Sequence, residues 1–231
     1  MKIGFTCRQT VMEGRGNMTE WEGEYVKYYS KFGIYPVLLT PEMLENDFIE
    51  SFVKELALEG FIIGGGNGVN PELWGEEKQH DNRWSEPRQK LNEWVLEYAE
   101  KNRMPVLGIC TGLHMLNVYF GGKLLQNIAK QTSSSIVHSP GNGHPHTPHA
   151  ILVDGKKVMV NSYHHQGILP EMVGNNLKVW AACEDGTIEA LYHESLPFVG
   201  ITWHPERDSP DIEFNEKLIK DFVNRQRFWK K

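Results

Sequence analysis

The chain has 231 residues, of which 40% are hydrophobic and 11% aromatic, and its formal net charge is −6 at pH 7. This composition supplies an apolar core and excludes a wholly disordered chain. The acidic balance disfavours nucleic acid and anionic membranes as partners. Because the sequence has only three cysteines, no export signal and no apolar run long enough to span a membrane, we expect a cytoplasmic protein without a disulfide scaffold.

The first half of the chain alternates short apolar stretches with segments of helical spacing. Four apolar stretches predict strands, at residues 2–6, 35–39, 61–63 and 104–109. Four segments with apolar residues at helical spacing predict helices, at residues 20–32, 41–57, 82–101 and 113–120. This alternation indicates an α/β fold with a mainly parallel sheet flanked by helices.

The second half has a different pattern, in which short strand-like pieces alternate with tight turns. These pieces lie at residues 150–153, 158–160, 177–182, 188–192 and 198–203, and an amphipathic segment at 214–228 predicts a closing helix. We expect a smaller antiparallel or mixed sheet that flanks the parallel one. Because no repeat or linker divides the chain, we expect one domain over residues 1–231.

Cys110 stands where the strand at 104–109 is expected to end and the next helix to begin. Gly108 and Gly112 flank it and allow the sharp turn that exposes a nucleophile. Ligands bind outside the carboxyl ends of parallel strands, and the start of a helix favours a thiolate. We therefore favour a nucleophile over a cysteine that only packs in the core, and expect the amide of Thr111 to donate to an oxyanion.

A nucleophilic cysteine needs a base, and His204 stands out among the ten histidines. It follows the apolar stretch 198–203, so it would also lie at a strand end. Glu206 follows two residues later, across Pro205, and can turn back to fix the imidazole tautomer. Taken alone, these residues fit a solvated turn equally well.

A run of glycines at 64–66 follows the strand at 61–63. It lacks the Gly-Lys-Ser/Thr ending of a phosphate loop and the fingerprint of a dinucleotide site. Glycine amides that approach an oxyanion explain the run better.

Three segments together resemble the class I glutamine amidotransferase-like family: GICTG at 108–112, VNSYHHQ at 160–166 and WHPE at 203–206. More narrowly, the chain resembles the γ-glutamyl hydrolase group, peptidase family C26, which includes hydrolases of γ-glutamyl-aminobutyrate and of γ-glutamyl-CDP-amidate. The resemblance covers the chain from the first strand to the last helix. It implies a flavodoxin-like α/β fold and chemistry that needs no cofactor.

The resemblance also implies the roles of individual residues. Cys110 would be the nucleophile, His204 the general base and acid, and Glu206 its orienting carboxylate. The amides of Thr111 and Gly65 would form the oxyanion hole. The other residues expected at the substrate are Gly66, Trp74, His114, Ser162, Tyr163, His164, His165 and Gln166.

Arg8 lies at the carboxyl end of the first strand, on the ligand side. It is a candidate for contacting an acidic group of the substrate, and it is compatible with an ordinary surface arginine as well. His114 departs from the family pattern, because many relatives have Gln at this position. Arg88-Gln89 likewise stands where relatives often have an Arg-Asp pair. The first departure concerns recognition of the glutamyl group rather than the chemistry.

The reaction implied by the resemblance is hydrolysis of a small γ-glutamyl amide through a γ-glutamyl thioester. γ-Glutamyl-CDP-amidate, in capsule phosphoramidate biosynthesis, and γ-glutamyl-aminobutyrate are candidate substrates. A glutaminase subunit that feeds ammonia to a synthetase partner stays open, as does an inactive binding protein of the same fold. The sequence leaves the oligomeric state open, and a homodimer is compatible with it.

The polar segment 131–149 contains His138, His144, His146 and His149. Histidine suits zinc and similar ions, but nothing else in the segment supplies a carboxylate or thiolate at ligand spacing. We therefore favour a solvated loop that closes over the active site and expect no metal.

Overall fold

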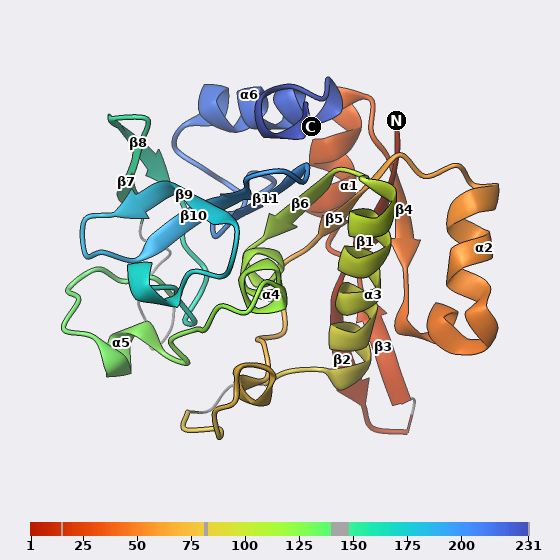
Figure 1. Ribbon diagram of the computed structural model, residues 1–231, viewed down its shortest axis with the longest axis horizontal. Helices are drawn as coiled ribbons and strands as arrows, with labels where there is room; N and C mark the ends of the chain where they lie inside the picture. Colours follow the sequence, from red (N-terminus) through yellow and green to blue (C-terminus); the bar gives the residue numbers. More distant parts are fainter. Residues whose placement is uncertain (15, 81–82, 140–147, 231) are drawn as a thin grey trace.

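The computed structural model describes residues 1–14, 16–80, 83–139 and 148–230. Within these residues the main feature is a nine-stranded sheet in the order β4-β1-β5-β6-β11-β10-β9-β7-β8 (Figure 1). The strands of one half run parallel: β4 (Tyr35–Leu39), β1 (Lys2–Thr6), β5 (Gly60–Ile63), β6 (Val106–Ile109) and β11 (Phe198–Ile201). The strands of the other half pair antiparallel: β10 (Ile188–His193), β9 (Leu177–Cys183), β7 (His149–Val153) and β8 (Lys156–Val160).

The expected α/β fold class is confirmed, and the antiparallel strands continue the same sheet from β11. A separate two-stranded sheet, β2 (Arg8–Met12) with β3 (Gly16–Glu20), follows β1 directly. Neither of these strands was predicted from the sequence. Their residues are mostly exposed, so the sequence lacks the alternation of apolar and polar residues that identifies a half-buried strand.

Helices cover both faces of the sheet. The α-helices are α1 (Gly23–Tyr29), α2 (Phe48–Glu55), α3 (Glu86–Asn102), α4 (Thr111–Tyr119), α5 (Ile128–Gln131) and α6 (Ile212–Val223). Short 3₁₀ helices are η1 (Ser30–Phe32), η2 (Pro41–Asp47), η3 (Pro71–Trp74), η4 (Pro170–Met172) and η5 (Arg227–Trp229). Figure 1 shows α3 and α4 in front of the parallel strands. None of the helices formed by the described residues is both long and apolar enough to span a bilayer.

The parallel strands are buried on both faces, which explains their continuous apolar sequences. Ile3 and Phe5 of β1 pack with residues of α1 and α6, whereas Phe61 and Ile63 of β5 pack with residues of α2, α3 and α4. Because parallel strands end at the same edge, the residues that follow β1, β5, β6 and β11 come together there. This edge contains the residues expected to form the active site.

Candidate active site

Cys110 occupies a sharp turn between β6 and α4, with φ 52° and ψ −103°. A Cβ atom at Gly108 would lie 2.5 Å from the carbonyl carbon of Gly112, and one at Gly112 would lie 2.2 Å from the carbonyl oxygen of Ile63. The expectation that this turn requires glycines on both sides is therefore confirmed. A non-glycine residue at positive φ is strained, and such strain is concentrated at functional sites.

His204 and Glu206 follow β11 and are both buried. His204 Nδ1 donates to Glu206 Oε1 at 2.5 Å. The side chain of Asn161 fixes the backbone of His204, because it accepts from the amide and donates to the carbonyl, each at 2.8 Å. The imidazole thus has a defined orientation and tautomer, with Nε2 directed away from the carboxylate.

The surroundings of Cys110 and His204 favour a thiolate next to an imidazolium. Burial alone would raise the pKa of the Cys110 thiol, but the hydrogen bond and positive charge of His204, with Arg207 and the Thr111 amide, lower it. Burial also disfavours the charged form of His204, but the charge of Glu206 and contact with Cys110 outweigh it and raise the pKa of His204. A cysteine in this state is nucleophilic at neutral pH.

The glycine run lies against Cys110 and His204. The amide of Gly65 already donates to Tyr25 Oη at 3.0 Å. Arg88, fully buried, donates through Nη2 to the carbonyls of Gly64 and Gly65 at 2.5 and 2.9 Å. Among the described residues, the amide of Gly66 has no hydrogen-bond partner. This geometry favours the amide of Gly66 over that of Gly65 as the partner of Thr111 in binding an oxyanion.

Replacement of Gly65 by alanine is expected to lower kcat/KM by about 10²-fold, because a displacement near 1 Å has an effect of this size. The new Cβ would lie 2.5 Å from Cε1 of His204 and 3.5 Å from Cβ of Cys110, so the imidazole must move. Steady-state kinetics of the variant measure the effect. Gly23→Ala is the matched control, since a Cβ at Gly23 meets no atom within 4 Å. Equal activity of the two variants would show that His204 tolerates the displacement.

Two cavities meet at this edge of the sheet and share Arg8 and Gly66. The smaller, of about 170 Å³, is lined by Arg8, Gly66, Cys110, Ser139, Tyr163, His204 and Arg207. The larger, of about 960 Å³, includes His165, Lys78, Arg83 and Trp84 in its lining. The structure thus places the expected nucleophile in a small polar cavity that borders a wider one.

The segment 161–166, expected to line the pocket, contributes two residues to these cavities. Tyr163 packs edge-on against the His204 ring at 5.6 Å, and His165 lines the larger cavity. Ser162 faces inward and donates to the carbonyl of His138 at 2.6 Å. Gln166 exchanges two hydrogen bonds with the backbone of Val69, at 2.8 and 3.0 Å. These inward residues hold the segment in place and line neither of the two cavities.

His164, the remaining histidine of this segment, is buried and directed toward Glu189, with Nε2 3.7 Å from Oε1. Burial lowers its pKa to about 4. It therefore belongs to the interior of the antiparallel half and lines neither of the two cavities described above.

Three expectations need correction. Trp74 is 9% exposed and packs in the hydrophobic core, and His114 is 2% exposed, with its pKa lowered to about 3 by burial. Neither lines a cavity described above, because η3 and α4 direct both side chains into the protein. His138 and His149 are buried rather than solvated, and their rings face the carboxylates of Asp185 and Glu189 in place of water. His144 and His146 lie outside the described residues.

Arg207 was not apparent as a site residue from the sequence. Its guanidinium lies 4.5 Å above the ring of Tyr163, and Nη2 lies 3.0 Å from Glu22 Oε2. Glu22 also pairs with Arg8 at 3.1 Å. The only signal for Arg207 in the sequence is that a cationic residue directly follows Glu206. The structure therefore adds a second arginine to the wall of the small cavity.

The fold is that of the glutamine amidotransferase-like class. A solved structure of a putative GMP synthase component from Thermoplasma acidophilum superposes with a TM-score of 0.65, covering 97% of this chain and 92% of that chain at 14% identity. The family model of Peptidase C26 matches residues 3–206. The chain belongs to the Peptidase C26 family and is a hydrolase with a glutamine amidotransferase-like fold.

Curated proteins from bacteria are similar over most of their length. The putative glutamine amidotransferase-like protein YvdE of Lactococcus lactis is 30% identical over 210 residues, or 87% of this chain and 86% of that protein. The gamma-glutamyl-gamma-aminobutyrate hydrolase PuuD of Escherichia coli is 27% identical over 240 residues, or 96% of this chain and 91% of that protein.

Proposed function

We propose that the protein hydrolyses a small γ-glutamyl amide to glutamate and an amine or amide. The arrangement of Cys110, His204 and Glu206 at the small cavity carries this proposal, because it supplies a nucleophile, a base and an orienting carboxylate. The name of the Escherichia coli relative, a γ-glutamyl amide hydrolase, supports the choice of substrate class.

In the proposed reaction, the Cys110 thiolate attacks the γ-carbonyl carbon and forms a C–S bond. The amides of Thr111 and Gly66 stabilise the resulting oxyanion. The C–N bond then breaks as His204 donates its proton to the departing nitrogen. Neutral His204 next removes a proton from water, which attacks the γ-glutamyl thioester. Glutamate is released, and the sulfur regains its thiolate state beside the imidazolium.

The arginines of the small cavity suit the α-carboxylate of a γ-glutamyl group. Arg8 and Arg207 both pair with Glu22, and Arg8 Nη1 also lies 3.8 Å from Glu20 Oε2. Both guanidinium groups still line the small cavity, where they can donate to a carboxylate of the substrate. The larger cavity, reached past Gly66, has room for the leaving group. γ-Glutamyl-aminobutyrate and γ-glutamyl-CDP-amidate differ mainly in this part, so the larger cavity would distinguish them.

Glutamate release from a panel of γ-glutamyl compounds tests the proposal. The panel contains glutamine, γ-glutamyl-aminobutyrate, other γ-glutamyl amines and γ-glutamyl-CDP-amidate, each run beside a Cys110→Ser variant. We expect strong turnover of one amide and little of glutamine. Turnover of glutamine alone would favour a glutaminase subunit that serves a synthetase. No turnover of any compound would contradict the proposal.

Arg207→Gln is expected to raise KM for the preferred γ-glutamyl substrate by about 10–100-fold, since a hydrogen bond to a charged group contributes about 1.5–3 kcal/mol. Loss of the positive charge also removes one influence that lowers the pKa of Cys110. Because the larger influence of His204 remains, we expect kcat to fall less than KM rises. Steady-state kinetics separate the two effects. Arg225→Gln is the control, because Arg225 is exposed and donates to the carbonyl of Glu59. An unchanged KM for Arg207→Gln would exclude it from substrate binding.

A further inference from the structure

A second cluster of titratable side chains lies inside the antiparallel half of the sheet. Its centre is Glu189 of β10, which is 0% exposed, and around it are His138, His149 and His164, which are 3%, 7% and 3% exposed. None of these residues lines either of the two cavities at Cys110. The proposed hydrolysis does not use them, so their burial together requires another explanation.

Three ring nitrogens face the carboxylate of Glu189. His138 Nδ1 lies 3.6 Å from Oε1, His149 Nε2 lies 3.6 Å from Oε2, and His164 Nε2 lies 3.7 Å from Oε1. These separations are too long for hydrogen bonds, and none of the three nitrogens has a hydrogen-bond partner among the described residues. Buried polar atoms in this state are costly unless another group lies between them.

The opposite nitrogens of two of these rings are already occupied. His138 Nε2 donates to Asp185 Oδ2 at 2.8 Å, and His164 Nδ1 donates to the carbonyl of Gln166 at 2.9 Å. Because a carbonyl and an ionised carboxylate can only accept, these bonds place the ring protons on the outer nitrogens. In the neutral rings, the lone pairs then point toward Glu189. Metal-binding histidines are held in the same way, by a carboxylate or a backbone carbonyl behind the ring.

We propose that His138, His149 and Glu189 bind a divalent transition-metal ion, because their ligand atoms all lie within 4.8 Å of one another. Zinc bonds of about 2.0–2.2 Å at tetrahedral angles place ligand atoms roughly 3.4 Å apart. The separations of 3.6–3.7 Å between the ring nitrogens and the carboxylate oxygens are close to this value. The two positive charges of such an ion balance Glu189 and Asp185. Nitrogen and carboxylate ligands of this kind suit zinc among the divalent ions.

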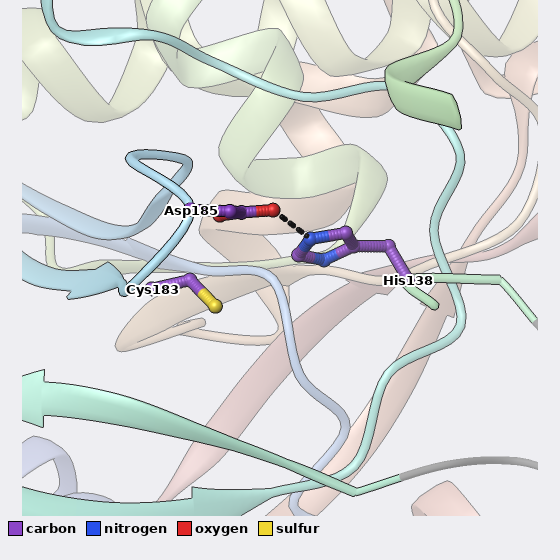
Figure 2. A group of neighbouring side chains, drawn as sticks. All are labelled: His138, Cys183 and Asp185. Carbon is purple, nitrogen blue, oxygen red and sulfur yellow. Dashed lines mark hydrogen bonds and ion pairs between the residues drawn. The ribbon is translucent and has the colours of Figure 1, made fainter. Parts of the chain in front are cut away.

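The neighbouring group of His138, Cys183 and Asp185 is less suited to an ion (Figure 2). Figure 2 shows the Asp185 carboxylate joined to the His138 ring. Each Asp185 oxygen has two partners, because Oδ2 binds Ser134 Oγ and His138 Nε2 while Oδ1 accepts from the amide and hydroxyl of Thr187. Each Glu189 oxygen accepts from one threonine hydroxyl, of Thr187 or Thr202, and so keeps room for an ion. The Cys183 thiol already donates to the carbonyl of Ala150, with Sγ 3.6 Å from the oxygen. Asp185 is therefore the residue that positions His138.

An ion at this site would join segments that are far apart in the sequence. His138 follows α5, His149 begins β7 and Glu189 lies in β10. The carbonyl of His138 accepts from the amide of His164 at 2.9 Å, which ties the segment carrying Tyr163 to the same site. The three ligands are buried and line neither of the two cavities at Cys110, so the ion stabilises the structure and does not take part in hydrolysis.

Metal content tests this proposal on the intact protein. We expect one zinc ion per chain, by elemental mass spectrometry, after equilibration with micromolar zinc and removal of the excess. Stripping the ion with a chelator is expected to lower Tm by about 5–10 °C relative to protein with zinc at roughly 100 times its Kd. Cobalt in place of zinc should give the visible absorption of tetrahedral coordination, without a thiolate charge-transfer band. Wild-type protein that retains no zinc and shows no such spectrum would overturn the proposal.

Variants then identify the ligands. Glu189→Gln and His149→Gln are expected to lose the ion, and Asp185→Asn is expected to bind it about 10–100-fold more weakly. His193→Gln is the matched control, because His193 is a buried histidine of the same strand, packed on Phe120 at 4.5 Å. Circular dichroism restricts the comparison to folded variants, and the cobalt spectrum of the wild type decides the case if Glu189→Gln does not fold. Retention of zinc by folded Glu189→Gln would contradict the assignment.

Discussion

Replacement of Cys110 by alanine is expected to lower kcat/KM by about 10⁴-fold or more, since loss of a nucleophile has effects of this size in other hydrolases. The side chain is 6% exposed and small, so the variant should keep the fold and the affinity for substrate. Glutamate release measures the first effect, and thermal unfolding with ligand titration measures the second. Residual activity near that of the wild type would exclude Cys110 as the nucleophile.

Alkylation supplies an independent check of this assignment. The pKa of the Cys110 thiol is lowered, whereas burial raises the pKa values of Cys7 and Cys183 to about 12. Near neutral pH, iodoacetamide should therefore modify one cysteine, in step with loss of activity. Mass spectrometry of the digested protein identifies the modified residue. Modification of Cys7 or Cys183 at the same rate would show that Cys110 is an ordinary thiol.

Glu206→Gln is expected to lower kcat by about 10⁴-fold, the effect of losing the orienting carboxylate in comparable triads, and to move the alkaline limb of the pH–rate profile to lower pH. Burial lowers the pKa of His204, but Glu206 and Cys110 outweigh it and raise it to about 9. Activity needs protonated His204 to release the leaving group, so the wild type should lose activity as pH rises through about 9. Removing the carboxylate charge lowers the pKa of His204, and the loss begins earlier.

The control for this prediction is Glu216→Gln, which removes an exposed carboxylate that pairs with Lys220 on α6. The profile of this variant should match that of the wild type. If Glu206→Gln keeps the wild-type alkaline limb, the limb belongs to another group and Glu206 does not govern the protonation of His204.

Elements whose signals are local could be predicted from the sequence. The strands at 2–6 and 35–39 were placed correctly, because both are apolar and bounded by polar residues or turns. The segment 41–57 instead divides into η2 and α2, since Asn46 has a φ of 56° that no helix accommodates. The predicted helix at 82–101 begins at Glu86, where the Ser85 side chain accepts from the amide of Arg88.

Some residues of the candidate site could likewise be predicted from local signals, whereas others depend on contacts with residues far away in the sequence. Cys110 could be found because its flanking glycines form a local signature. The difference between Gly65 and Gly66 depends on Tyr25, which is 40 positions away in the sequence, so no local pattern contains it. Trp74 and His114 were assigned to the substrate by resemblance, and their burial depends on how η3 and α4 pack.

The distance along the chain between Cys110 and His204 has a consequence for biosynthesis. Translation proceeds from the N-terminus, so Cys110 leaves the ribosome well before His204 and the Asn161 contact that fixes it. Without His204, an exposed thiol has a pKa of about 8.5 and little reactivity at neutral pH. A growing chain therefore carries an ordinary cysteine, and the reactive thiolate arises only when β11 has joined β6. Under the proposed roles of Cys110 and His204, we therefore expect the nascent chain to be less sensitive to alkylation and oxidation at Cys110 than the folded protein.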